Sequence, residues 1–85
     1  MRNYLDDLMV ITMEECGEVI QECSKIYRFG ASAEAVKRLE KEIGDLTQMI
    51  DLMHKFDLVS YTNIDKYSEE KYEKLKKYSD LIPED

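Results

Sequence analysis

The sequence has few of the residues that interrupt helices or cross-link a chain. Its 85 residues include three glycines, one proline, two cysteines and no tryptophan. Two cysteines are too few for a disulfide scaffold. Cys16 and Cys23 also lie seven residues apart on one predicted helix, about 10 Å along its axis, which is beyond disulfide reach. The chain shows neither the layout of a signal peptide nor an apolar run long enough to span a membrane. Free thiols without an export signal predict a cytoplasmic protein with no membrane partner.

Positive charge is also scarce. Twelve Lys and Arg residues face 19 Asp and Glu residues, which gives a formal net charge of −7. Nucleic-acid binding needs clustered Lys and Arg on a surface, so this balance argues against a nucleic-acid partner. It does not exclude nucleotides, because a bound metal ion reverses the local sign of charge.

Two long helices are predicted in the first two thirds of the chain. Apolar residues recur at helical spacing from Asn3 to Phe29, and Gly30 follows where a left-handed cap usually ends a helix. Ser32 is a suitable N-cap for a second helix, whose apolar residues continue as far as Met53.

A third helix is predicted after a loop at residues 57–63, with its N-cap at Thr62 or Asn63. It carries apolar residues from Ile64 to Tyr78, and Pro83 lies beyond its end. No stretch alternates with the period of a strand. We therefore expect one all-α domain, residues 1–85, built as an antiparallel bundle of three main helices. Because the core of so short a chain is marginal, we expect self-association to complete the bundle.

The acidic residues of the first helix are distributed unevenly around it. At about 100° per residue, with Glu14 at zero, the apolar stripe covers roughly 120° to 240° and is centred near Cys16. Glu15, Glu22 and Glu18 fall at about 100°, 80° and 40°, so they line one border of the core. Glu14 points further outward.

Two acidic residues of the second helix lie inside its apolar arc. With Glu42 at zero, this arc runs from roughly 280° through zero to about 120°, and Asp45 falls at about 300°. A buried carboxylate without a partner costs several kcal/mol, so cations must meet the two groups or the groups must be protonated. On the third helix Lys71 is predicted to face the interior, but one lysine cannot neutralise four carboxylates. A divalent ion that prefers oxygen ligands would balance the excess.

The spacing of these acids supports the same interpretation. Residues at i and i+3 stand above one another on a helix, so Glu15 with Glu18, and Glu42 with Asp45, can each share an ion. Gly17 and Gly44 lie beside the two pairs, and glycine inside a helix suggests a close approach of backbone or ligand. The competing interpretation is that these are ordinary surface carboxylates paired with Lys and Arg. It fits a single pair well and two such pairs poorly.

The motif itself resembles a known family. Glu14-Glu15-x-x-Glu18 followed by Glu42-x-x-Asp45 is similar to the signature of the MazG-like, all-α nucleoside triphosphate pyrophosphohydrolases. Lys71 and Tyr72, followed by Glu73 and Lys74, resemble the Lys-Phe-Glu-Arg segment at the start of that family's last helix. Residues 25–30 look like the corresponding stretch of compact phage-encoded members. The resemblance covers roughly residues 8 to 78.

The resemblance implies hydrolysis of a nucleoside triphosphate to a monophosphate and pyrophosphate with Mg²⁺, or alternatively Mn²⁺. It implies metal ligands at Glu15, Glu18, Glu42 and Asp45. It implies catalytic roles for Glu14, Glu18 and Lys71, and contacts to the substrate phosphates from Lys25, Arg28, Lys71 and Lys74. For Lys25 and Arg28, solvated cations favoured by the dipole at a helix C-terminus are an equally good explanation.

Three further expectations stay open. The family resemblance implies a homodimer or homotetramer with sites near subunit interfaces. The main alternative to an enzyme is a non-catalytic regulatory or interaction module on a MazG-like fold, which would show no metal dependence. A second alternative keeps the site but changes the substrate to phosphoribosyl-ATP or a signalling nucleotide.

Overall fold

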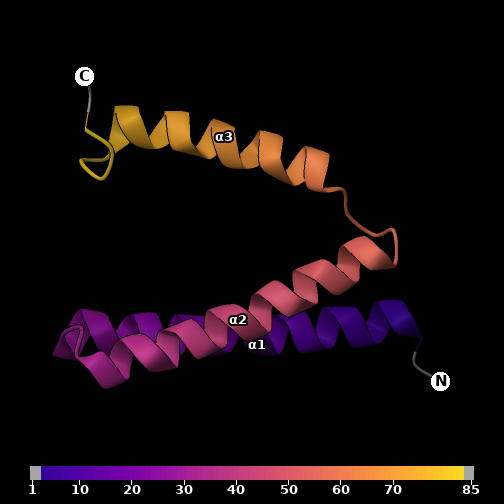
Figure 1. Ribbon diagram of the computed structural model, residues 1–85, viewed down its shortest axis with the longest axis horizontal. Coiled ribbons are helices and arrows are strands. Elements are labelled where there is room, and N and C mark those ends of the chain that lie inside the picture. The colour runs from indigo at the N-terminus through magenta and orange to yellow at the C-terminus, as the bar shows by residue number, and fades with distance from the viewer. Residues whose placement is uncertain (1–2, 84–85) are drawn as a thin grey trace.

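Three helices account for most of the chain. The computed structural model describes residues 3–83, so the predicted domain extends two residues beyond it at each end. These residues form α1 (Tyr4–Phe29), α2 (Ala33–Lys55) and α3 (Tyr61–Tyr78), with no strand among them (Figure 1). The prediction of an all-α fold is therefore confirmed.

Local hydrogen bonds explain where α1 and α2 begin and end. The Asn3 side chain accepts a hydrogen bond from the backbone N–H of Asp6 at 3.0 Å, which caps the start of α1. Gly30 ends α1 with a φ of 95°, a left-handed value that glycine adopts without steric cost. The Ser32 hydroxyl accepts from the N–H of Ala35 at 3.1 Å and caps α2. The cap at Ser32 and the end at Gly30 are both as predicted.

The start of α3 differs from the prediction. Its N-cap is Ser60, whose hydroxyl accepts from the backbone N–H of Asn63 at 3.5 Å. The predicted cap at Thr62 or Asn63 is therefore wrong by two or three residues. Serine, threonine and asparagine all cap helices well, so a run containing all three does not fix the boundary.

The core lies between α1 and α2, which run antiparallel and pack along their length (Figure 1). Its buried apolar side chains are Leu8 of α1 and Ala35 and Met49 of α2. Glu22 of α1 is a buried charged residue, and its carboxylate accepts a hydrogen bond from Arg38 of α2 at 3.1 Å. This charged pair ties the two helices together at the end near their connecting loop.

Only one border of the predicted apolar stripe of α1 meets α2. Leu8 and Glu22 are buried, whereas Cys16 and Cys23, at the centre of the stripe, are exposed. Met13, Ile20 and Tyr27 on the far border are 65%, 68% and 90% exposed. Part of the apolar surface of α1 is thus left uncovered by the described residues of one chain.

Helix α3 extends away from the other two. It follows a short loop after α2, runs back roughly antiparallel to α2, and has no buried residue (Figure 1). Its contacts with α2 lie near the loop, where Tyr61 hydrogen-bonds Asp51 and packs on the His54 ring at 4.6 Å. The Cα radius of gyration is 15.7 Å, against about 12 Å for a compact chain of this length. A single chain therefore consists of a helical hairpin, α1 and α2, and a third helix that stands apart from it.

Within the described residues, none of the helices combines the length and the apolar character required to cross a bilayer.

Candidate metal-binding site

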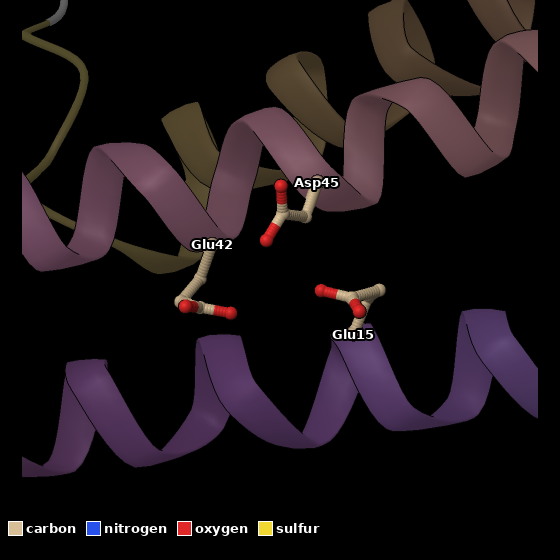
Figure 2. A group of neighbouring side chains, drawn as sticks. All are labelled: Glu15, Glu42 and Asp45. Atoms are coloured by element: carbon tan, nitrogen blue, oxygen red, sulfur yellow. The ribbon is translucent and has the colours of Figure 1, made fainter.

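Three of the four predicted metal ligands converge between α1 and α2. Glu15 projects from α1 toward α2, while Glu42 and Asp45 project from α2 toward α1 (Figure 2). One carboxylate oxygen from each of the three lies within 4.8 Å of the others. We call these three residues the carboxylate cluster. Since Glu42 and Asp45 are one helical turn apart, packing α1 against α2 is sufficient to bring the third carboxylate to them.

The cluster is partly withdrawn from solvent. The side chain of Glu42 is 14% exposed and that of Asp45 is 44% exposed. Glu15 is half-buried, and its Oε2 atom is fully covered without a hydrogen-bond partner among residues 3–83. Buried carboxylate oxygens normally find a donor or a cation, so this atom points to a missing partner.

The electrostatics of Glu15 reflect this crowding. Burial raises the pKa of the Glu15 carboxyl above its usual range. The negative charges of Asp45 and Glu42 raise that pKa further, and the Lys41 ammonium lowers it without reversing the shift. The Glu15 carboxylate is therefore held at a cost that an added cation would offset.

The Lys41 side chain brings a cation to the cluster. The ammonium of Lys41 lies 3.3 Å from Glu42 Oε1 and 3.1 Å from Asp45 Oδ2, and both carboxylates raise its pKa by accepting hydrogen bonds from it. The Lys41 side chain is 71% exposed, so it covers the cluster from the solvent side. A single ammonium against three carboxylates leaves an excess of negative charge when all three are ionised.

The other acidic residues of the motif lie outside the cluster. Glu18 is exposed on α1 and is not one of the three converging carboxylates, although its charge contributes to the raised pKa of Glu15. Glu14 is also exposed on α1. Both stand within one turn of Glu15, beside the cluster rather than in it.

The predicted basic residues of α3 are distant from the cluster. Lys71 and Lys74 are exposed on a helix that has almost no contact with α1 or α2. The expectation that Lys71 faces an interior is not met within one chain, because the face it shares with Tyr67 and Tyr78 is uncovered. Lys74 instead borders a surface hollow of about 670 Å³ along α3 itself.

The two basic residues at the end of α1 have local partners. Lys25 lies 3.3 Å from Glu22, one turn earlier on the same helix. The Arg28 side chain donates to the Ser24 carbonyl at 3.4 Å and lies 5.2 Å from the centre of the Phe29 ring. These contacts fit the explanation that both residues stabilise the C-terminal end of α1.

The two glycines beside the motif do not mark a close approach within one chain. A Cβ atom added at Gly17 or Gly44 would meet no described atom within 4 Å beyond the local helix. The expectation of tight backbone contact at these positions is therefore wrong for the single chain.

The residues present fit a divalent cation. Three carboxylates provide the hard oxygen ligands that Mg²⁺ and Mn²⁺ prefer, and one covered oxygen has no other described partner. Open faces on α1 leave room for further oxygen ligands from Glu18 or water. The cluster can therefore hold a metal ion.

The sequence pattern predicts no role for two residues of the site. One is Lys41, although its spacing from Asp45 is the i, i+4 spacing of helical ion pairs. The other is Arg38, the partner of Glu22, which the sequence places at the core border. Which residue of α2 meets Glu22 depends on how far the two helices slide along each other, which the sequence pattern does not specify.

Comparison with known proteins assigns neither a family nor a function to the chain. No protein-family model matches the chain, and neither a curated protein nor a solved structure is significantly similar to it.

Proposed function

We propose that this chain is a metal-dependent nucleoside triphosphate pyrophosphohydrolase of the MazG-like type. The observation that carries the proposal is the carboxylate cluster: Glu15, Glu42 and Asp45 converge from two helices, with a covered oxygen left unpaired among the residues described. The motif that contains these residues resembles that family's signature. The helical positions and the folded arrangement thus favour the same three acids.

The protein residues divide the chemistry between them. Glu15, Glu42 and Asp45 would hold Mg²⁺, or Mn²⁺ in its place, and Glu18 would be a further ligand. Such an ion would supply positive charge against the phosphates and lower the pKa of a bound water. Glu14 or Glu18, exposed and one turn or less from Glu15, accepts the proton that the water loses. Cleavage of the bond between the α- and β-phosphates then releases the nucleoside monophosphate and pyrophosphate.

The proposed phosphate contacts require a second copy of the chain. Lys71 and Lys74 lie on α3, which within one chain stands apart from the cluster. Helix α3 carries five lysines against four acidic residues, whereas α1 carries six acidic residues against two basic ones. This difference in charge favours packing of α3 from one copy beside α1 of another, which would also complete the predicted antiparallel bundle. Lys25 and Arg28 are weaker candidates for contacts to the substrate phosphates, because both already have partners on α1.

Incubation with a panel of nucleoside triphosphates and Mg²⁺, followed by detection of pyrophosphate, tests the proposal. We expect pyrophosphate from at least one nucleotide, none after chelation of the metal, and at least a hundredfold loss of rate in Glu42→Gln. Glu40→Gln is the matched control, because Glu40 is an exposed acid on the same helix and lies outside the cluster. Phosphoribosyl-ATP and signalling nucleotides belong in the panel because they share the triphosphate or pyrophosphate linkage. A native chain inactive on every member would rule the enzyme out.

The alternative function is a non-catalytic helical module. It is favoured by the ion pairs of Lys41 with Glu42 and Asp45, since those pairs neutralise part of the cluster without any metal. Calorimetric titration with Mg²⁺ or Mn²⁺ separates the two functions. The enzyme predicts binding by the native chain that Glu42→Gln removes, and the module predicts no binding by either protein.

A further inference from the structure

Lys41 contacts the same carboxylates that a bound metal ion would use. Its ammonium contacts Glu42 Oε1 and Asp45 Oδ2, which are oxygens of two of the three converging carboxylates. A divalent ion bound at those same oxygens would repel the ammonium at hydrogen-bond distance. Metal binding there would therefore compete with the two ion pairs of Lys41.

The position of Lys41 determines where its ammonium goes. The side chain is 71% exposed, on the solvent side of α2, so no packing holds it against the cluster. Its four-carbon stem is anchored one residue before Glu42 and one turn before Asp45. The displaced ammonium thus stays at the rim of the site, with its positive charge next to any anion that binds the metal.

We propose that Lys41 is a displaceable internal cation: it partly neutralises the carboxylate cluster in the metal-free protein and contacts a substrate phosphate once metal is bound. This inference rests on the proposed function and adds a substrate-binding residue to it. It also explains how the ion pairs that favour a non-catalytic module can belong to an enzyme. Unlike Lys71 and Lys74, Lys41 reaches the cluster within one chain.

Two substitutions separate the effect of the Lys41 contact from the effect of removing one positive charge from α2. Lys41→Met removes the ammonium and keeps an unbranched stem of similar length. Lys37→Met removes the same charge from the preceding turn of α2, where Lys37 is exposed and outside the cluster. Calorimetric titration with Mn²⁺ alone should show affinity about three- to tenfold higher for Lys41→Met than for Lys37→Met, because the competing ion pairs are gone.

The proposed phosphate contact predicts that Lys41→Met binds anions more weakly, although it binds the metal ion more tightly. With each protein saturated with Mg²⁺, inorganic pyrophosphate added as its magnesium complex should bind roughly tenfold more weakly to Lys41→Met than to Lys37→Met. In the nucleotide assay the KM of Lys41→Met should rise by a similar factor while kcat changes less. Lys41→Arg, which keeps the charge, should restore most of the pyrophosphate affinity.

The outcomes separate this inference from the function on which it rests. Native binding of Mn²⁺ together with equal affinities in the two methionine variants would overturn the role of Lys41 and leave the metal site standing. Mn²⁺ binding by Lys41→Met but not by the native chain would overturn the enzyme and the phosphate contact, because the native chain must bind the metal, and would leave only the competition between Lys41 and metal. Tighter metal binding without weaker pyrophosphate binding would overturn the phosphate contact. Failure of all the proteins to bind metal would overturn both proposals.

Discussion

At the scale of single residues, the functional signal is a carboxylate that the fold does not satisfy. Glu22 is the more deeply buried acid, but Arg38 and Lys25 pair with it, so its burial is explained by structure alone. Glu15 is less buried, yet one of its oxygens is covered and unpaired in the described part of the chain, and its neighbours are also acids. Burial by itself therefore does not distinguish a site from a structural ion pair, whereas the sign of the neighbouring charge does.

Glu15→Gln should make the metal-free protein more stable. The raised pKa of Glu15 means that the folded state disfavours the ionised carboxylate, so at neutral pH its charge lowers the free energy of unfolding. Glutamine removes that charge and can donate a hydrogen bond. Thermal unfolding in the presence of a chelator should therefore give a higher Tm for Glu15→Gln than for the native chain.

Addition of metal should reverse this order. A metal at a hundred times its Kd stabilises a folded protein by about 2.7 kcal/mol, a gain that Glu15→Gln should largely lose. Glu40→Gln should follow the native chain with and without metal. A Glu15→Gln protein that is less stable than the native chain without metal would show that Glu15 is structural.

At the scale of the elements, the sequence specified the helices better than it specified their contacts. Gly30 and Ser32 mark the turn between α1 and α2 because each has a local geometric role, and both boundaries were predicted. The apolar arc of α2 correctly placed Glu42 at the centre of the face that meets α1. The stripe of α1 was misleading at Cys16, because a helix can offer more apolar surface than one neighbour covers. The pairing of Glu22 with Arg38 depends on how α1 and α2 are positioned along each other, and the apolar pattern of either helix alone does not predict that position.

The Glu22–Arg38 pair should make the α1–α2 contact sensitive to acid. Burial alone raises the pKa of Glu22, but the hydrogen bonds and charges of Arg38 and Lys25 outweigh it and lower the pKa below its usual value of 4.5. The ionised carboxylate therefore stabilises the folded state above about pH 4.5, and this contribution is lost as the pH falls through the lowered pKa.

Denaturant unfolding at a series of pH values tests whether ionised Glu22 stabilises the fold and whether this stabilisation is lost in acid. The native chain should be more stable than Glu22→Gln at pH 7, and the difference should narrow as the pH falls below 4.5. Glu40→Gln is the control, because it removes the same charge from an exposed position on α2. A gap between native and Glu22→Gln that stays constant down to acid pH would mean that the pair contributes through shape rather than charge.

At the scale of the whole molecule, one chain lacks the core that its helices could build. Three buried apolar residues are described, while Met13, Ile20 and Tyr27 leave an apolar face of α1 open and α3 stands apart. Helical periodicity predicts how much apolar surface each helix offers but not which copy of the chain covers it. For that reason the all-α class could be predicted from the sequence, whereas the bundle that joins α3 to the other helices stays a prediction.

Ile20→Lys should separate self-association from the fold of the hairpin. Ile20 is 68% exposed on the open face of α1, so lysine there costs little in an isolated chain but places an unpaired charge inside the proposed interface. A cost of about 3 kcal/mol corresponds to a roughly hundredfold higher Kd for association. Sedimentation equilibrium should show a dimer or tetramer for the native chain and mainly monomer for Ile20→Lys at the same concentration.

The control is the neighbouring position, because Gln21→Lys adds the same charge to an exposed residue about 100° further around α1. That variant should associate like the native chain. If α3 of a second copy supplies the lysines that contact phosphate, Ile20→Lys should also lose pyrophosphate release while it still binds Mn²⁺, since Glu15, Glu42 and Asp45 belong to a single chain. A native chain that sediments as a monomer and is nevertheless active would place the whole site within one copy. In that case Lys41, rather than Lys71, would be the cation that meets the substrate.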